Sequence, residues 1–178
     1  FFSFLAIFIL QSTNDLPATD RTQSEAKKIK VSYELDINVP RKVLGDEFRL
    51  EHVLGNLLSN AIKFSDLEST ISIRVSYDTK VKNHVTFSVT DQGPGMSAED
   101  QKHLFQPFMQ IRPGELQKGR GSGLGLSICK TIVSLHNGTI GCTSKQRVGD
   151  DKKSGGSEFF FNIEFAEVQY DDTDGEET

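Results

Sequence analysis

The chain has 178 residues, enough for a single domain with a sizeable hydrophobic core, and its composition is typical of a globular protein. Its formal net charge of −5 argues against binding nucleic acid through a broad basic surface, so we expect no nucleic-acid partner. The two cysteines form neither a CxxC pair nor a Cys/His metal-binding spacing, and nothing in the sequence indicates a disulfide framework.

The chain opens with an apolar stretch, FFSFLAIFIL, over residues 1–10. A membrane-spanning helix needs about 20 apolar residues, and this stretch lacks the basic flank and the cleavage site of a signal peptide. We therefore expect a buried strand or the start of a core helix, with the end of a preceding helical domain as the alternative. The polar residues 11–24 contain Pro17 and predict a loop or a weakly formed helix start. Residues 1–28 are interpreted as a lead-in that can form part of the domain.

The next two segments predict a strand and a helix. Apolar and polar residues alternate from Ile29 to Ile37, as in a half-buried strand, and Pro40 ends the pattern. Asp46 can cap the N-terminus of a helix that runs to about Phe64. The apolar residues of this helix recur three and four positions apart and predict a buried stripe: Leu50, Val53, Leu54, Leu57, Leu58, Ala61 and Ile62.

The rest of the chain predicts further strands and helices. We expect strands at 71–77 and 85–89, a helical turn or two at 97–105, a loop at 110–123, a helix at 124–136, and strands at 138–145 and 158–166. The acidic segment 169–178 is predicted to be disordered, and the domain itself is assigned to residues 29–168. Consecutive strands mixed with helices predict an α/β two-layer sandwich, in which helices cover one face of a mixed, largely antiparallel sheet.

Three polar side chains share one face of the first predicted helix. Asn56, Asn60 and Lys63 are spaced at i, i+4 and i+7, away from the apolar stripe. Two carboxamides and an amine on one face can hold a hydrated Mg²⁺, which prefers oxygen ligands and keeps several waters, and can reach phosphate oxygens. Taken alone, such a pattern is more often the polar outer face of an amphipathic helix.

A second motif, DQGPG at 91–95, directly follows a predicted strand. A carboxylate at a strand end, here Asp91, can accept a hydrogen bond from an exocyclic amine. Gly93 and Gly95 let the backbone turn sharply and approach a planar ligand closely. The alternative is a plain turn.

A third motif, GRGSGLGL at 119–126, opens the helix predicted at 124–136. Alternate glycines are costly unless the backbone needs positive φ or close approach. Free amides at a helix start form an anion site, although the spacing is neither that of a Rossmann fold nor that of a Walker loop. A glycine-rich phosphate lid is the functional interpretation, and a linker is the alternative.

The order of these motifs resembles that of the ATPase domain shared by histidine kinases, type II topoisomerases, ninety-kilodalton chaperones and mismatch-repair ATPases. The resemblance covers about residues 29–166 and includes a Phe-Pro-Phe segment before the third motif. It is close to the kinase branch in four segments: GDEFRLEHVLGNLLSNAIKFS, VTDQGPGMSAED, LFQPFMQ and GRGSGLGLSICKTIVSLHNGTI. The resemblance implies a Bergerat-type ATP-binding fold with ATP and Mg²⁺ as ligands.

The resemblance also implies roles for individual residues. Asn60 would coordinate Mg²⁺ between the phosphates, with Asn56 beside it, and Lys63 would reach a phosphate. Asp91 would accept a hydrogen bond from the adenine amino group. The glycines of the DQGPG motif would shape that pocket, with Met96 near the base.

An ATP lid is implied over residues 109–122. Phe105 and Phe108 would hinge it, or would simply be core aromatics. Lys118 or Arg120 would contact phosphate, although lids vary. The triphosphate would be covered by the following residues: Gly121, Ser122, Gly123, Leu124, Gly125 and Leu126.

One position departs from the hydrolytic branches, which place a Glu base one turn before the metal-binding Asn. Asn56 stands there, and Glu51 falls on the opposite face of the helix. The resemblance thus implies a site that positions ATP and stabilises charge, while the acceptor brings the nucleophile, a neutral imidazole. None of the histidines in this chain has the acidic, proline-containing context of the acceptor helix: His52, His84, His103 and His136.

The resulting hypothesis is the ATP-binding catalytic domain of a two-component sensor histidine kinase. It would transfer the γ-phosphoryl group of ATP to a His on a helical domain absent from this chain, and would not be self-sufficient without that domain. The alternatives are a nucleotide-binding regulatory module and an ATP-operated conformational switch without kinase activity. The parent protein is expected to be a homodimer and to act with a response-regulator receiver domain. This domain would be cytoplasmic, and the sequence leaves open whether the parent protein is anchored in a membrane.

Overall fold

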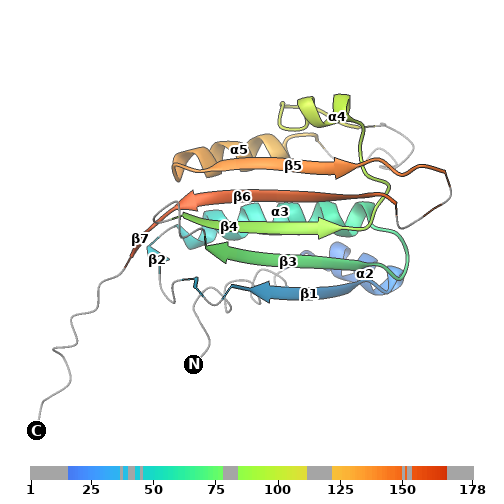
Figure 1. Cartoon of the computed structure of the whole chain (residues 1–178), viewed down its shortest axis with the longest axis horizontal. Coiled ribbons are helices and arrows are strands. Elements are labelled where there is room, and N and C mark those ends of the chain that lie inside the picture. The colour runs from blue at the N-terminus through green and yellow to red at the C-terminus, as the bar shows by residue number, and fades with distance from the viewer. Residues whose placement is uncertain are drawn as a thin grey trace, which may run out of the picture.

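The structure is a computed structural model that describes residues 16–36, 38–39, 43–44, 46–77, 84–111, 122–149, 151 and 154–167. Its elements follow in chain order (Figure 1): α2 (Ala18–Lys27), β1 (Lys30–Leu35), β2 (Val43–Leu44), α3 (Glu47–Phe64), β3 (Thr70–Tyr77), β4 (His84–Asp91), α4 (Ala98–His103), α5 (Gly125–Leu135), β5 (Thr139–Lys145), β6 (Gly156–Glu164) and β7 (Ala166–Glu167).

Five strands form one sheet in the order β1-β3-β4-β6-β5. The edge strand β1 runs parallel to β3, whereas every other neighbouring pair in this sheet is antiparallel. The short strands β2 and β7 pair separately, also antiparallel. The expected mixed, largely antiparallel sheet is therefore confirmed.

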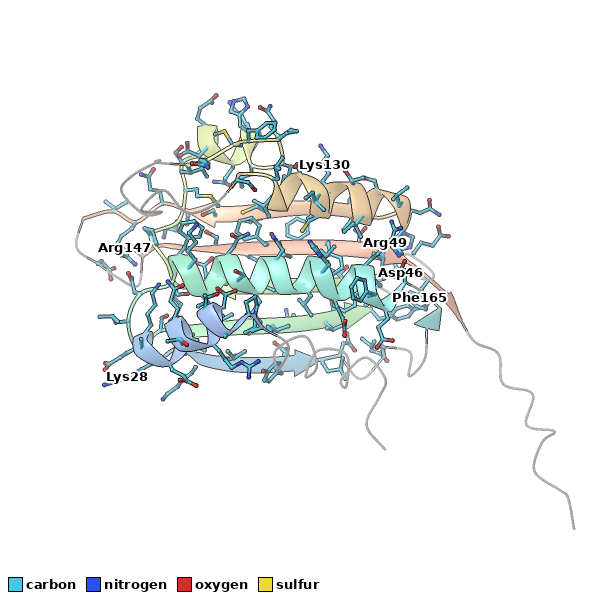
Figure 2. The ribbon with its side chains drawn as sticks, turned by 180° about the vertical axis from the view of Figure 1, so that it is seen from behind. Lys28, Asp46, Arg49, Lys130, Arg147 and Phe165 are labelled. Atoms are coloured by element: carbon cyan, nitrogen blue, oxygen red, sulfur yellow. The ribbon has the colours of Figure 1, made fainter. Side chains whose placement is uncertain are left out.

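Helices cover one face of this sheet. Seen from behind, α3 lies across the middle of the sheet with α2 and α5 on either side of it (Figure 2). The short helix α4 lies at the β5 edge (Figure 1). This arrangement is the two-layer sandwich that the sequence predicts.

The core lies between α3 and the sheet. All seven apolar residues of the predicted helical stripe are buried, and Val53, Leu54 and Leu57 are completely so. From the sheet, every second residue of the central strands faces them, and the rings of Phe87 and Phe161 stack with centroids 4.8 Å apart. Each fully buried aliphatic side chain contributes about 1.5–3 kcal/mol to folding. The packing of α3 therefore fixes its rotation about its axis, and with it the direction of its polar face.

The N-terminal part of the described chain differs from the prediction. Residues 11–24 are expected to form a loop or a weak helix start, but a full helix, α2, begins directly after Pro17 and ends at Lys27. The residue that caps it, Lys28, has a left-handed φ of 53°. No residue of α2 is buried, so no apolar stripe marks it in the sequence. Its stability comes from contacts with α3 and the loop that follows α3, which local patterns do not reveal.

The C-terminal strand also differs slightly. The strand expected at 158–166 is divided into β6 and β7, because the chain leaves the main sheet at Phe165 and pairs with β2. The predictions for residues 1–10, for the lid over 112–121 with Lys118, Arg120 and Gly121, and for the acidic segment 169–178 lie outside the described residues. Among the helices of the described ranges, none is long and apolar enough to cross a membrane.

Candidate nucleotide-binding site

A cavity of about 330 Å³ lies between α3, the DQGPG loop and the start of α5. It brings together residues from all three motifs that the sequence analysis identified. Most of its polar residues come from α3, whereas its apolar residues come from α3, the loop after β4, the segment after α4, α5 and β6. Its size is in the range of small-molecule sites, which are mostly apolar with a few placed polar groups.

The polar wall of the cavity is formed by the predicted face of α3. Asn56, Asn60 and Lys63 all line it, together with Ser59. The helix starts where expected, because the side chain of Asp46 accepts a hydrogen bond of 3.1 Å from the backbone N–H of Arg49. The burial of the opposite stripe then turns the polar face toward the cavity.

The two asparagines of this wall are hydrogen-bonded to each other. Nδ2 of Asn60 donates to Oδ1 of Asn56 over 3.2 Å, which leaves Oδ1 of Asn60 to accept from, or coordinate, a bound species. On its other side, Asn56 lies against the first residue of α5. A Cβ at Gly125 would come within 2.5 Å of Nδ2 of Asn56, so a larger residue there would displace the Asn56 amide.

Lys63 contributes a positive charge to the same wall. Its Nζ lies 5.3 Å from the centroid of the Phe64 ring, which also lines the cavity. Burial lowers the pKa of Lys63 from its ordinary value, while the charge of Asp20 on α2 opposes this shift.

Asp91 lies at the end of β4, lines the cavity from the sheet, and is only 5% exposed. Burial raises the pKa of its carboxyl group to about 6, and hydrogen bonds from the backbone N–H groups of Gly93 and Ser157 oppose that rise. The Gly93 bond to Oδ1 is 2.8 Å long. The carboxylate is thus a buried hydrogen-bond acceptor that is ionised above about pH 6.

The glycines of the DQGPG loop are required by close backbone contacts. Gly95 has a φ of +65°, and a Cβ there would come within 1.9 Å of the carbonyl oxygen of Lys145. A Cβ at Gly93 would come within 2.6 Å of the carbonyl oxygen of Phe64, at the end of α3. Gly95 and Pro94 line the cavity, whereas Gly93 lies behind it and joins the loop to α3.

Met96 lines the cavity as expected, and a polar network holds it in place. Its backbone N–H donates to Oγ of Ser144, and its carbonyl accepts from Nε2 of Gln101. The same Gln101 amide donates to the carbonyl of Ser144 and accepts from its N–H. Gln101 therefore joins α4 to the free edge of β5 and supports the end of the loop.

Several apolar lining residues were not predicted from the sequence. Leu104 comes from the segment after α4, and Phe159 comes from β6 beside Ser157, whereas Met109 and Ile111 belong to the segment 109–122 that is expected to form the lid. Ser157 and Phe159 lie here because Asp91 is paired with Ser157 across β4 and β6. Alternation marks Phe159 as an inward-facing residue, but the strand that it would neighbour is not encoded locally.

The glycine-rich segment is only partly described. Ser122, Gly123, Gly125 and Leu126 line the cavity, whereas Leu124 does not and precedes the first turn of α5. Unpaired N–H groups at a helix start can bind an anion, so anion binding at the start of α5 stays a prediction.

Phe108 also lies outside the cavity lining. It is 74% exposed and has a φ of 63°. Its backbone contacts Gly123, where a Cβ would come within 2.7 Å of the Phe108 carbonyl carbon. The residues that flank the segment expected to form the lid therefore meet at its base, while Phe105 packs against the core.

The donor set fits a hydrated Mg²⁺. Among the described residues there is no cluster of three or more His, Cys, Asp or Glu side chains that could hold a metal ion. Mg²⁺, however, needs few protein ligands when phosphates supply others, and the free Oδ1 of Asn60 is an oxygen ligand of the right kind.

Comparisons with known proteins place this geometry in context. The family model described as "Histidine kinase-, DNA gyrase B-, and HSP90-like ATPase" matches residues 45–167. The peroxide stress-activated histidine kinase mak1 of Schizosaccharomyces pombe is 36% identical over 139 residues, which cover 76% of this chain and 8% of mak1. The sensor histidine kinase RcsC of Escherichia coli K12 is 35% identical over 143 residues, covering 80% of this chain and 14% of RcsC. The chain thus spans a small part of the length of these relatives.

Solved structures agree on the fold. Full-length ShkA in complex with AMPPNP aligns with a TM-score of 0.71 and 25% identity, over 92% of this chain and 30% of ShkA. The nucleotide-free catalytic domain of the histidine kinase ThkA aligns with a TM-score of 0.67 and 26% identity, over 90% of this chain and 91% of that domain.

Proposed function

Because the chain belongs to the histidine kinase-, DNA gyrase B-, and HSP90-like ATPase family, we propose that its cavity binds ATP and that it is the catalytic domain of a sensor histidine kinase. One observation carries the proposal. The cavity is lined by a buried carboxylate, Asp91, at the end of β4 and by the row of Asn56, Asn60 and Lys63 on α3. A ligand with an amine at one end and phosphates at the other satisfies both.

The proposed orientation follows from the charges. The carboxylate of Asp91 accepts a hydrogen bond from the exocyclic amine of adenine, and Met96, Leu104 and Phe159 pack around the base. The triphosphate lies toward Lys63 and the start of α5. Gly121, Ser122, Gly123, Leu124, Gly125 and Leu126 form the proposed cover of the phosphates.

Asn60 is the proposed protein ligand of Mg²⁺, and Asn56 orients it through the hydrogen bond between their amides. Magnesium bound here would neutralise negative charge on the phosphates during transfer. Lys63 adds a second positive charge on the same wall. These residues bind and orient the triphosphate, which is most of what phosphoryl transfer needs from a protein.

The proposed acceptor is a histidine imidazole on a separate helical domain of the parent protein. Asp91 is the one acidic residue among the described residues that line the cavity, and it lies at the adenine end. No carboxylate of this lining is therefore placed to activate water beside Asn60. In the proposed reaction a neutral imidazole nitrogen forms a bond to the γ-phosphorus, the bond to the β-phosphate oxygen breaks, and ADP leaves.

The wider architecture is also part of the proposal. The helical domain and a response-regulator receiver domain are the expected partners, and the parent is expected to be a homodimer. The names of the relatives support the kinase assignment on which this architecture depends, since mak1 and RcsC are both named as histidine kinases.

Calorimetric titration of the chain with a non-hydrolysable ATP analogue, with and without Mg²⁺, tests the first step. We expect saturable binding that strengthens with Mg²⁺. No binding by a chain shown to be folded would contradict the proposal and would favour a regulatory module instead.

The second step is tested with ATP labelled at the γ-phosphate and a histidine-bearing helical partner. Label should appear on the partner's histidine, and a variant partner that lacks this histidine is the control. Binding of ATP without transfer to any such partner would favour a conformational switch.

A further inference from the structure

The side chain of Lys27, the last residue of α2, ends at the C-terminus of α3. Its Nζ donates hydrogen bonds of 2.9, 2.8 and 2.8 Å to the backbone carbonyls of Ile62, Lys63 and Ser65. An ammonium group has three donors and no acceptor, so all three donors are used. The backbone of Lys27 adds a fourth contact, because its carbonyl accepts a hydrogen bond of 2.7 Å from the N–H of Glu68.

This contact is suited to a positive charge. The last carbonyls of a helix have no partner within the helix and carry the negative end of its dipole. The Ala61 carbonyl accepts from the N–H of Ser65, and Lys27 satisfies the next two carbonyls. Burial lowers the pKa of Lys27 from its ordinary value, and the nearby charge of Asp66 opposes that shift. Charge-assisted hydrogen bonds are about twice as strong as neutral ones.

The carbonyls that Lys27 holds flank the contact between α3 and the DQGPG loop. The carbonyl of Phe64, which lies between those of Lys63 and Ser65, is the atom against which Gly93 packs. The N–H of Gly93 in turn donates to the carboxylate of Asp91. A continuous series of contacts therefore runs from Lys27 through the end of α3 and Gly93 to Asp91.

The loop after α3 is held from the other side as well. Asp66 forms an ion pair with Arg147. The backbone N–H of Arg147 donates a hydrogen bond of 2.8 Å to the carbonyl of Pro94. Arg147 and Lys28 are labelled at the end of the molecule where α3 finishes, whereas Asp46 and Arg49 mark its start (Figure 2). The end of α3 is thus fixed between α2 and the loop that joins β5 to β6.

We propose that Lys27 is a positioning residue of the nucleotide site, which holds the last turn of α3 so that Asn60 and Lys63 meet the triphosphate while Gly93 keeps Asp91 in place. The inference rests on the proposed ATP binding. It adds that α2, the first helix of the described chain, is part of the binding machinery rather than a lead-in. Lys27 does not line the cavity, so it acts through α3.

The neighbouring lysine supplies a matched control. Lys28 has the same charge and belongs to the same helix end, but it forms an exposed ion pair with Glu68, with the two side chains 74% and 72% exposed. Exposed ion pairs of this kind contribute little to the stability of a fold. Lys27→Met and Lys28→Met therefore remove the same charge from adjacent positions, and only the first removes contacts with α3.

The experiment measures two properties of the full chain for wild type and both variants, at a temperature where circular dichroism shows all three to be folded. The first is the affinity for Mg-ATP and for adenosine. We expect Lys27→Met to weaken Mg-ATP by about tenfold and adenosine by about threefold, because Asn60 and Lys63 lie on the helix end that Lys27 holds whereas Asp91 is reached only through Gly93, with Lys28→Met within about twofold for both. A loss of global stability alone would not change the ratio of the two affinities in a folded protein.

The second property is the amide hydrogen exchange of Ser65 and Gly93, which needs no nucleotide. Exchange at both should accelerate in Lys27→Met and not in Lys28→Met. The proposal is overturned if Lys27→Met and Lys28→Met have the same ratio of Mg-ATP affinity to adenosine affinity and the same exchange rates.

Should wild type bind no ATP, the proposed function fails, and the exchange measurement still decides whether Lys27 holds the contact between the end of α3 and the DQGPG loop. If Lys27→Met does not fold, Lys27→Gln, which keeps two donors without the charge, undergoes the same measurements, and wild-type values in it would equally contradict the proposal.

Discussion

At the scale of single residues, Asp91 has the most strongly altered chemistry of the cavity. It is almost fully buried, and burial raises the pKa of its carboxyl group to about 6. A carboxylate is an acceptor for an amine only while it is ionised. The charge state of Asp91 should therefore control both the binding of adenine and part of the stability of the chain.

The affinity for ATP should fall as the pH drops below about 6. With the pKa of Asp91 at about 6, ATP affinity should be about tenfold lower at pH 5 than at pH 7, because protonation changes tenfold per pH unit. Titrations of ATP at these pH values measure the effect. Inorganic tripolyphosphate, which lacks the base, and the Asp91→Asn variant control for other titrating groups, and a parallel fall in all three would contradict the role of Asp91.

The same group should make the stability depend on pH. In the unfolded chain the pKa of Asp91 returns to its ordinary 3.8, so the folded state binds more protons between pH 3.8 and 6. The free energy of unfolding should therefore fall as the pH rises through this window, by on the order of 3 kcal/mol from this residue. Urea unfolding of wild type and Asp91→Asn at pH 4 and pH 7.5 isolates the contribution. The stability of the variant relative to wild type should increase with pH, and a constant difference would count against the buried charge.

Asn60 should be responsible for the magnesium dependence of nucleotide binding. Its Oδ1 is the oxygen that the contact with Asn56 leaves free. In Asn60→Ala, affinity for a non-hydrolysable ATP analogue should be the same with and without Mg²⁺. Asn60→Asp keeps an oxygen ligand and should retain the response. An Asn60→Ala variant that still responds to Mg²⁺ would place the metal elsewhere.

At the scale of elements, α3 and the loop after β4 depend on different properties of the chain. The helix is specified by spacing, with a capping Asp46 at its start and a continuous buried stripe along it. The loop is specified by two close backbone contacts, those of Gly93 with Phe64 and of Gly95 with Lys145. A helix of this kind tolerates a methyl group on its surface, whereas the loop does not.

Two glycine substitutions should separate these cases. Gly95→Ala places a methyl group at a φ of +65° and within 1.9 Å of a carbonyl oxygen, so the loop must move. It should lower the free energy of unfolding by at least about 1 kcal/mol and weaken ATP binding by more than about tenfold. Gly55 in α3 has no atom within 4 Å of the added position, and Gly55→Ala should raise stability by roughly 0.5–1 kcal/mol. Denaturant unfolding and ATP titration test both variants, and equal effects would show that local strain in the loop is unimportant.

At the scale of the whole molecule, the sheet order brings distant segments to one cavity. The antiparallel pairing of β4 with β6 sets Ser157 beside Asp91, and the packing of α5 on α3 sets Gly125 against Asn56. The resulting cavity has polar groups from both the sheet and α3, but among its described lining residues Asp91 is the one carboxylate. This composition agrees with the proposed function, in which the site holds ATP for an external acceptor rather than hydrolysing it.

The chain on its own should therefore hydrolyse ATP slowly, and Asn56→Glu should increase the rate. A general base contributes about 100-fold or more where its geometry is right, so an increase of at least about tenfold is expected. Phosphate release from ATP measures it, with Asn56→Gln as a control of similar size without a carboxylate. A rate that stays flat in Asn56→Glu would mean that the position of the base relative to water, and not its absence alone, prevents hydrolysis.

Much of this organisation could be predicted from local sequence. The spacing of Asn56, Asn60 and Lys63 opposite an apolar stripe follows from the helical period, and the buried residues of the stripe are confirmed. The alternation in β3 and β4 likewise indicated which side chains face the core. Each of these features depends on residues within a few positions of each other, which is the range over which helix and strand periods operate.

Other features depend on contacts between segments far apart in the chain, and sequence patterns did not reveal them. Helix α2 has no buried residue to mark it, and its last residue, Lys27, reaches α3 across 35 to 38 positions. Phe159 reaches the cavity because β6 pairs with β4, which sets its start beside Asp91. Local periods specify which face of an element is buried, but which elements pack together is decided by all of them at once. The β6 residues that line the cavity and the contact of Lys27 with the end of α3 follow from that packing.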